Sequence, residues 1–580
     1  MDKAPIFERN LRALSLNDPA LSREIAGAGG GSRYRFVESR SGEIVPAIID
    51  GEGRSRPLHS TVDPKREAAR LVSSFGRDES FLVFFGLGGG FHAAAALKRP
   101  ETGRLIIVEY GLAGLAELFS ALDYAPILGD SRVSLLLDRE PAGLEAYILG
   151  NYLPALSGGF RLLPLRARTE LSPGEFLPAG EAVRRALERL SADYSVQAHF
   201  GSRWFENILR NLKRAEEPGP PLPRPRRAAV CAAGPSLDIQ IPLLAEDLRK
   251  KPAERPFLIA TDTSLPALLC AGIEPGAVVS IDCQHISCYH FMGSGTGDGR
   301  GKTVSRLPGR LFLDLASPPL LARLSAAPCF FSGGHPLASY ISQYWRPLLP
   351  VDSSGGNVTY AALSLAERLG AERIDLYGAD FSYPLGRTYA RGTYIYPFFE
   401  RRQNRRGPLE ALHSGFLYRS PLEKIPGEDS RPGASWYYET AILRRYRELL
   451  EEKAASMTSR VRPMPGLGAP IRIRQKPGPG SKPGGQAAFN PGPPRMGADE
   501  FLSAYRNRVR ALKPLDGKAG FGSGNLRETD PDSRLILTTL LPLAAALRRR
   551  EPGLRPDETL ERTRAYALAS IDRVLGNTSA

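Results

Sequence analysis

Short apolar runs alternate with longer amphipathic stretches along most of this chain. Each run is bounded by polar or glycine-containing turns and has the composition of a buried strand. The runs lie at 81–85, 105–108, 228–232, 257–260, 277–281, 311–313 and 374–377. Because the stretches between them are typical of helices, we predict a multidomain α/β protein with mostly parallel sheets.

The first 215 residues contain two such regions. Residues 1–75 combine a helical start at 7–25 with strand-like runs at 34–37 and 44–49. In residues 76–215, the run 81–85 leads through a glycine-rich turn and a helix-compatible stretch to the run 105–108. This order predicts a βαβ unit and therefore a Rossmann-like domain.

Proline and glycine mark the later boundaries. The segment 216–227 (EEPGPPLPRPRR) can continue neither a helix nor a central strand, so it predicts a linker. Strands and helices then alternate through a central domain at 228–455, whose clearest helix spans 358–369. Residues 456–496 are rich in Pro and Gly and predict a second linker.

Residues 497–580 predict a helical C-terminal domain. Phe501, Tyr505, Val509 and Leu512 recur at helical spacing and form one apolar stripe. This stripe either closes a small core or docks on a protein partner, and the sequence leaves both alternatives open.

Composition narrows the class of protein. At 580 residues the chain is too long for one core. Its formal net charge of +15 suits anionic partners, yet the basic residues are scattered and form no nucleic-acid-binding module, so we expect no nucleic-acid partner. The five cysteines are odd in number and confined to the central region, which argues against a disulfide framework.

The chain also lacks the signals of export or membrane insertion. Its first ten residues have no apolar signal-peptide core. The most apolar late stretch, 535–547, contains Pro542 and is shorter than the roughly 20 residues that span a bilayer. We expect a cytoplasmic protein without a membrane span.

A glycine turn opens the central domain. Gly234, Pro235 and Ser236 follow the run 228–232 and precede a predicted helix. Glycine lets the backbone approach a phosphate, and a helix N-terminus favours negative charge. An ordinary strand-to-helix turn explains the same three residues, so this motif alone does not predict a ligand.

Polar residues at later strand ends strengthen the prediction of a nucleotide site. Asp262 and Thr263 end one strand and Asp282 ends the next, where short polar side chains can hydrogen-bond a base or ribose. Further along, Ser354, Gly355 and Gly356 precede a helix, and Gly378 and Asp380 end another strand. Tyr383 and Tyr389 follow and could stabilise a departing phosphate.

Two other groups suggest ligands less strongly. Gly86, Gly88 and Gly90 with Glu109 have the pattern of an S-adenosylmethionine or dinucleotide site, although a tight turn needs only one or two of those glycines. The stretch 283–290 (CQHISCYH) crowds four zinc-type ligands together. Structural zinc usually takes two separated pairs, so we expect free cysteines and helix-face histidines, and no metal site.

The central segments resemble those of the motility-associated (Maf) glycosyltransferases, which are grouped with proteins described as 6-hydroxymethylpterin pyrophosphokinase MptE-like. They are also similar, more distantly, to bacterial sialyltransferases that use CMP-sialic acid. In those sialyltransferases a GPSL turn, polar strand ends, a Ser-Gly helix start and a G-x-D-F segment followed by tyrosines surround the CMP. The resemblance to Maf proteins also covers the N-terminal half of the chain.

The resemblance implies a glycosyltransferase that moves a nonulosonic, sialic-like acid from a CMP-activated donor to Ser/Thr hydroxyls of flagellin. No cofactor is implied as a requirement, and a role for Mg²⁺ is left open. The implied nucleotide-binding residues are Gly234, Pro235, Ser236, Asp262, Thr263, Asp282, Ser354, Gly355, Gly356 and Gly378. The implied catalytic residues are Asp380, Tyr383, Tyr389 and His413, with the tyrosines on the phosphate and His413 as the base.

One departure and two alternatives accompany this interpretation. The Maf pattern often has a histidine where this chain has Tyr389, which matches the sialyltransferase pattern instead. An MptE-like pyrophosphokinase would need ATP and Mg²⁺, for which the strand-end aspartates Asp262, Asp282 and Asp380 could serve as ligands, but no P-loop is present. A non-catalytic flagellin-binding assembly factor is the other alternative.

Overall fold

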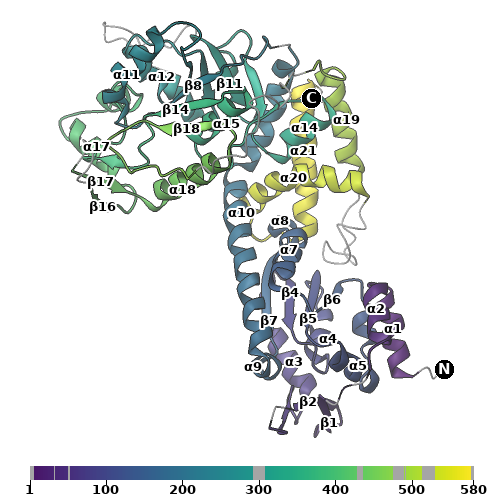
Figure 1. Cartoon of the computed structure of the whole chain (residues 1–580). Helices are drawn as coiled ribbons and strands as arrows, with labels where there is room; N and C mark the ends of the chain where they lie inside the picture. Colours follow the sequence, from purple (N-terminus) through teal and green to yellow (C-terminus); the bar gives the residue numbers. More distant parts are fainter. Residues whose placement is uncertain are drawn as a thin grey trace. The chain divides into compact units, whose positions relative to one another are not determined.

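The computed structural model describes residues 5–29, 31, 33–49, 52–217, 219–291, 307–427, 435–474, 489, 492–512 and 530–576. The chain divides into two compact units. The first comprises Met1–Ser202 with Arg506–Ala569, and the second Arg203–Tyr505 with Ser570–Ala580. Figure 1 labels their helices and strands.

The first unit starts with two helices, α1 (Ile6–Ser15) and α2 (Pro19–Ala26), where the sequence suggested one helical stretch. The break is local in origin, because the Asp18 side chain accepts a hydrogen bond from Leu21 N and Pro19 starts a new helix. A three-stranded antiparallel sheet follows, in the order β1 (Tyr34–Glu38), β2 (Ile44–Ile49) and β3 (Ser55–Pro57).

A four-stranded parallel sheet is the centre of the first unit. Its order is β6 (Val133–Leu137), β5 (Arg104–Glu109), β4 (Glu79–Phe85) and β7 (Gly159–Pro164). Alternate side chains enter two cores, Leu82 and Ile107 on one face and Val83 and Ile106 on the other. The intervening helices are α3 (Pro64–Ser73), α4 (Phe91–Leu97), α5 (Leu112–Ala121), α6 (Ala125–Leu128), α7 (Pro141–Asn151), α8 (Pro154–Ser157) and α9 (Arg166–Leu171).

Long helices complete the chain. α10 (Pro173–Ala215) runs from the first unit into the residues of the second, and α19 (Ala498–Ala511) and α21 (Pro556–Leu575) also contain a unit boundary. α20 (Pro531–Arg550) packs on α8 within the first unit. None of the described helices is both long and apolar enough to cross a bilayer.

The second unit is built on an eight-stranded sheet in which every neighbouring pair is parallel. Its order is β13 (Leu349–Pro350), β12 (Cys329–Ser332), β11 (Arg310–Asp314), β10 (Ala277–Ser280), β9 (Phe257–Thr261), β8 (Arg227–Cys231), β14 (Arg373–Tyr377) and β18 (Arg460–Pro463). The chain builds outward from β8 in one direction and then returns to add β14 on the other side. The boundary between β8 and β14 is therefore a topological switch point, where open α/β sheets bind ligands.

Helices cover both faces of this sheet (Figure 1). α11 (Leu237–Arg249) and α12 (Leu265–Cys270) share a core with one face, whereas α15 (Val358–Arg368) and α18 (Ala441–Ser456) share a core with the other. The shorter connections are η1 (His285–Phe291), α13 (Pro319–Ala322) and α14 (Pro336–Tyr344).

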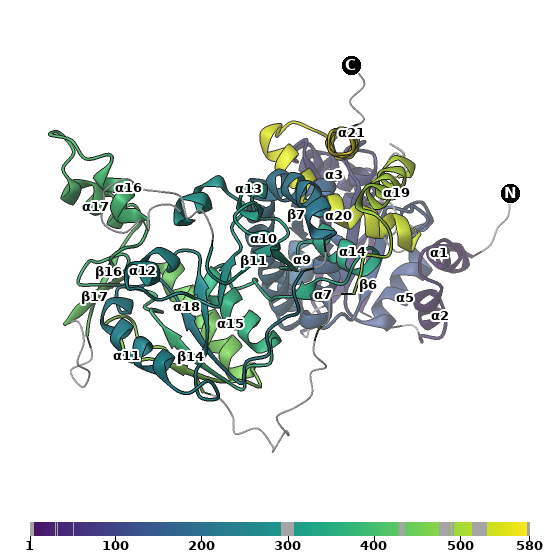
Figure 2. The same ribbon diagram turned by 90° about the horizontal axis from the view of Figure 1, so that it is seen from above.

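A small subdomain projects from the second unit. Its antiparallel sheet has the order β15 (Tyr383–Pro384), β17 (Trp436–Glu439) and β16 (Glu423–Pro426). Figure 2 shows α16 (Ile395–Glu400) and α17 (Leu409–Leu417) grouped beside these strands. The subdomain carries Tyr383 and His413.

The predicted multidomain α/β fold class is confirmed. The division of the chain differs from the six predicted segments, because part of the segment 456–496 forms β18 and pairs with β14. Residues 475–488, 490 and 491 of that segment lie outside the described residues. The apolar stripe of the tail is buried: Phe501 and Tyr505 pack against Tyr340 of α14 with tilted rings.

Candidate functional site

Two glycine turns meet at the switch point. Gly234 N donates a hydrogen bond to Gly378 O (2.8 Å), which joins the turn after β8 to the turn after β14. A Cβ on Gly234 would lie 2.4 Å from Asp380 Oδ2, and Gly378 has φ +62° with its Cβ position 2.3 Å from Ala232 O. Both glycines are therefore required by the close approach of the two turns themselves.

The side chain of Asp380 accepts two hydrogen bonds from Ser236 next to this contact. Ser236 N donates to Asp380 Oδ2 (2.7 Å), and Ser236 Oγ donates to Asp380 Oδ1. The chain after β18 closes over the pair, because Gly468 N donates to Asp380 Oδ1 (3.0 Å) and Leu467 N to Ser236 Oγ (2.6 Å). Both side chains are buried and both carboxylate oxygens are engaged. In this arrangement the pair positions the two turns.

A second polar group lies at the ends of β9 and β10. The Asp262 carboxylate accepts from Ser280 Oγ (2.7 Å), Thr263 N (2.7 Å) and Thr263 Oγ1 (3.0 Å). Its Oδ2 also lies 3.2 Å from Nδ1 of His290 in η1. Burial lowers the pKa of His290, but the Asp262 carboxylate, which also accepts its hydrogen bond, and the more distant Asp282 together outweigh it, so the pKa lies above its ordinary value. Asp262 therefore orients His290 and favours its protonated form.

Asp282 lies beside this pair with its carboxylate only partly buried. It accepts a hydrogen bond from Gln284 N (2.9 Å). Burial raises the pKa of Asp282, and the nearby Asp262 carboxylate raises it further. It is thus the strand-end aspartate that remains most accessible to a ligand.

Aromatic side chains continue from the Asp262–His290 pair. The rings of His290 and Tyr394 are 4.6 Å apart, and those of Tyr394 and Tyr389 are 6.1 Å apart. Burial raises the pKa of Tyr389 and of Tyr394, and the Arg419 cation offsets part of this effect. Both hydroxyls are therefore protonated donors at neutral pH. Tyr383 lies close enough for its own ionisation to raise the pKa of Tyr389 further.

The loop that carries Tyr389 is fastened to the β8 turn. Ala390 N donates to Ala233 O (2.9 Å), and Arg391 N donates to Asp238 Oδ1 (2.9 Å). Arg387 forms an ion pair with the same Asp238. These contacts hold the tyrosine loop against the strand ends of the switch point.

The Ser354 turn is arranged differently from the predicted anion site. α15 is capped by Asn357, whose side chain accepts from Tyr360 N (3.0 Å). Ser354 is exposed, and its N and Oγ both donate to Asp352 Oδ1 (3.0 and 2.7 Å). Gly355 lies against the Tyr360 ring and Gly356 has φ +70°. The sequence predicted that donors of this turn bind a phosphate. The Asp352 carboxylate already accepts hydrogen bonds from two of them, Ser354 N and Oγ.

His413 lies within an aromatic cluster. Its ring centroid is 4.9 Å from that of Phe399 and 5.3 Å from that of Tyr396. Phe416 links this cluster to Tyr389, with centroids 6.2 Å apart. The role of His413 as a base stays a prediction.

Sequence reasoning missed several residues of this site. His290 was considered only as a zinc-type ligand, Tyr394 and Ser280 were not selected, and Arg419 was not singled out among the many arginines. The signal for His290 was its place shortly after the Asp282 strand end. Among the described residues, the histidines and cysteines of 283–290 do not form a cluster of metal-ligand atoms.

Comparisons with known proteins place this geometry in a family. The family model described as 6-hydroxymethylpterin diphosphokinase MptE-like matches residues 203–386. Two proteins of Treponema pallidum (strain Nichols), both described as uncharacterized, are 31% identical: one over 164 residues (26% of this chain, 56% of the relative), the other over 172 (29% and 80%). The chain belongs to the MptE-like family. The part of this chain that matches the first of these relatives spans 56% of that relative's length.

A solved structure extends the likeness of this MptE-like chain over both units. The Maf glycosyltransferase from Magnetospirillum magneticum AMB-1 is 14% identical, with a TM-score of 0.55, and the match covers 98% of this chain and 95% of that one. At this identity the match establishes the fold. The family model ends at residue 386, before Tyr389 and His413.

In the first unit, the protein's own side chains occupy the space beside the glycine-rich turn after β4. Glu109 accepts from Leu87 N (3.0 Å) and forms an ion pair with Arg168 at 3.0 Å, and both charged side chains are buried. A Cβ on Gly86 would lie 3.0 Å from the Arg168 side chain. In this MptE-like chain Arg168 therefore satisfies the carboxylate that would otherwise bind a ribose.

Proposed function

We propose that this chain is a glycosyltransferase that moves a nonulosonic acid from a CMP-activated donor to Ser/Thr hydroxyls of flagellin in the cytoplasm. The fold shared with the Maf glycosyltransferase supports the reaction class. The observation that carries the proposal is the row Asp262, His290, Tyr394 and Tyr389 beside the β8/β14 switch point. It combines an oriented imidazole with neutral phenol donors at the edge where α/β sheets bind nucleotides.

The donor would be divided between two parts of the site. The turns at Gly234 and Gly378, with Thr263 and Asp282 at the neighbouring strand ends, would hold the nucleoside. Tyr383 and Tyr389 would donate hydrogen bonds to the phosphate that leaves, and Arg419, whose guanidinium lies 3.9 Å from the Phe416 ring centroid, would add positive charge.

In the reaction, the acceptor oxygen bonds to the anomeric carbon as the bond to the CMP phosphate breaks. The phosphate keeps the bonding electron pair, and a base takes the hydroxyl proton. His290 is the stronger candidate for that base because Asp262 orients it, in the manner of a histidine activated by a carboxylate. His413, the base implied by resemblance, is the competing candidate.

The family description supports a second candidate, a 6-hydroxymethylpterin diphosphokinase. That reaction needs ATP and Mg²⁺. Asp262 and Asp380 already accept several hydrogen bonds each, so Mg²⁺ could use them only after those bonds were lost. This cost favours the transferase, which needs no cation held by the three aspartates.

A nucleotide panel separates the two candidates. Thermal unfolding of the purified chain is measured with CMP, CTP, ATP with Mg²⁺, and S-adenosylmethionine. The transferase predicts stabilisation by the cytidine nucleotides, roughly 2.7 kcal/mol at 100 times the dissociation constant. Stabilisation by ATP and Mg²⁺ alone would favour the kinase, and no response would favour a non-catalytic assembly factor.

A further inference from the structure

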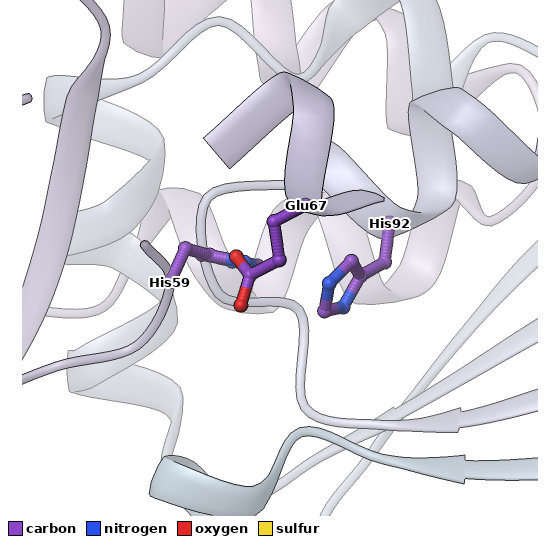
Figure 3. A group of neighbouring side chains, drawn as sticks. All are labelled: His59, Glu67 and His92. Carbon is purple, nitrogen blue, oxygen red and sulfur yellow. The ribbon is translucent and has the colours of Figure 1, made fainter. Parts of the chain in front are cut away.

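Three potential metal ligands gather in the first unit, and none of them is among the residues of the proposed transferase site. His59 follows β3, Glu67 is on α3, and His92 is in the first turn of α4. One ligand atom from each residue lies within 4.8 Å of the other two. Figure 3 shows the side chains of His59, Glu67 and His92 extending toward one another.

The two imidazoles have buried nitrogens without a partner. Among the described residues, neither His59 Nδ1 nor His92 Nε2 makes a hydrogen bond. The His59 side chain is 1% exposed, and its Nδ1 lies 3.8 Å from Glu67 Oε2. His59 Nε2 accepts a hydrogen bond from Gly89 N (2.9 Å), which only a neutral imidazole can do. Neutral imidazoles and a carboxylate are the ligand forms that zinc-type ions bind.

The spacing is slightly wider than a filled site. In a tetrahedral zinc site with bonds of about 2.1 Å, ligand atoms lie roughly 3.4 Å apart. The Glu67 side chain is 41% exposed, so it can move inward and also gives an ion access from solvent. Its Oε2 accepts a hydrogen bond from Ser60 N (2.8 Å), and this contact orients the carboxylate.

One contact decides how His59 would bind. Gly89 N donates to His59 Nε2 (2.9 Å), so in this state the proton of the neutral ring is on Nδ1. An ion at Nδ1 requires the other tautomer, in which Nε2–H must find an acceptor. Gly88 O is the neighbouring carbonyl of the same peptide, and it now accepts from Tyr124 Oη (2.5 Å).

The turn around this peptide is suited to rotation. Gly90 N donates to Leu87 O (3.0 Å), which makes Gly88–Gly89 the central peptide of a β-turn. Gly88 has φ +52°, whereas Gly89 lies outside the left-handed region. Turning the peptide over exchanges a type II′ turn for a type I′ turn and needs positive φ at both positions, which glycine supplies.

We propose that His59 Nδ1, Glu67 and His92 Nε2 bind one divalent transition-metal ion of the zinc type, and that binding turns over the Gly88–Gly89 peptide. In the bound state Gly88 O accepts from His59 Nε2–H, the arrangement by which backbone carbonyls orient metal-ligating histidines. The Tyr124 hydroxyl loses its acceptor. The ion therefore couples directly to the glycine-rich turn after β4.

The first test measures zinc retained by the full-length protein. The chain is stripped with a chelator, dialysed against Zn²⁺, and its metal content is measured by inductively coupled plasma mass spectrometry. Wild type should retain one more ion per chain than His92→Gln or Glu67→Gln. His285→Gln, an exposed histidine of the 283–290 stretch, should match wild type.

Two results would overturn the site: equal zinc content in wild type and both ligand variants, or loss of the ion in His285→Gln. Circular dichroism and the unfolding midpoint without metal check that each variant is folded. Glu67→Gln, at an exposed side chain, keeps the test valid if His92→Gln misfolds. An unchanged unfolding midpoint of wild type in the presence of Zn²⁺ would also contradict the site, because an ion that binds the folded chain stabilises it.

The second test addresses the peptide. Tyr124→Phe removes the hydroxyl that holds Gly88 O in its present position and so removes a contact that opposes turnover. Its zinc dissociation constant should be roughly two- to tenfold lower than that of wild type, as expected for one hydrogen bond. An unchanged or higher constant would contradict the rotation of the turn.

Discussion

At the scale of single residues, the carboxylate–histidine pair at the ends of β9 and β10 is the strongest chemical feature of the site. The sequence identified Asp262 because it ends an apolar strand, but its partner is 28 residues away across a connection that the strand pattern does not describe. Ser236 and Asp380 were both selected from strand-end turns. The hydrogen bonds between them could not be predicted from the sequence, because they form only where β8 and β14 become neighbours. The amides of residues 467 and 468, which also donate to this pair, come from a third, distant part of the chain.

The two candidate bases are separated by substitution. His290→Gln should lower kcat by about 10² to 10⁴ if His290 is the base, and His413→Ala should then have a small effect. Transfer rates at saturating donor measure this contrast. The reverse ranking would assign the base to His413, and full activity of both variants would show that neither removes the proton.

The pH dependence of the rate tests the same pair. A base must be neutral, so the rate should fall as pH falls through the pKa of His290, which Asp262 holds above its ordinary value. Asp262→Asn removes that influence and leaves burial, the largest cause, which lowers the pKa and is opposed only by the weaker effect of Asp282. The acidic limb of the kcat/KM profile should therefore move to lower pH. An unmoved limb would show that His290 does not control it.

Tyr389 tests the role of the phenols. Its hydroxyl would meet the charge that develops on the leaving phosphate. Tyr389→Phe should therefore lower turnover more than it weakens CMP binding. Calorimetric CMP affinity and kcat are compared in the same variant. An equal loss in both would place the hydroxyl in nucleotide binding alone.

At the scale of elements, apolar runs predicted β4 and β5 of the first parallel sheet and β8, β9, β10, β11 and β14 of the second, because buried parallel strands are hydrophobic on both faces. The analysis missed β6, β7, β12, β13 and β18, although β6 (VSLLL) and β12 (CFFS) are apolar runs of the same kind. β18 has the sequence RVRP and is at the sheet edge, where polar side chains are tolerated, and β13 has only two residues. α10 was also missed as one 43-residue helix, because Pro178 and mixed charges interrupt its pattern.

Two helical glycines allow a matched stability test in the first unit. A Cβ on Gly201 of α10 would lie 1.8 Å from the Pro542 carbonyl oxygen of α20, whereas Gly150 of α7 has open space. Gly201→Ala should destabilise by roughly 1–3 kcal/mol because the helices must separate. Gly150→Ala should be neutral or slightly stabilising. The urea midpoints of unfolding are measured for both variants. Equal midpoints would contradict the close approach of α10 and α20.

At the scale of the whole molecule, the tail illustrates what sequence pattern leaves open. Its apolar stripe was compatible with a core or with a docking face, since helical spacing shows only that one side is apolar. Phe501 and Tyr505 pack within the second unit, and residues 506–569 belong to the first. The apolar pattern of one segment shows which face is buried, but it does not show which other part of the protein covers that face.

Truncation after Pro465 tests this organisation. It removes the Leu467 and Gly468 amides that donate to Ser236 and Asp380, and also the stripe residues that pack against Tyr340. We expect a lower unfolding midpoint and loss of stabilisation by CMP. A truncated protein with the wild-type midpoint and CMP response would show that the tail is an independent module.

The most direct test of the central claim is a single transfer reaction followed by mass spectrometry. Purified chain is incubated with monomeric flagellin and a panel of CMP-activated nonulosonic acids, and the intact mass of flagellin and the released CMP are measured together. The account predicts that flagellin gains the mass of the sugar residue, with one CMP released for each sugar added. Flagellin of unchanged mass with every donor, together with AMP formed from ATP and 6-hydroxymethylpterin, would contradict it.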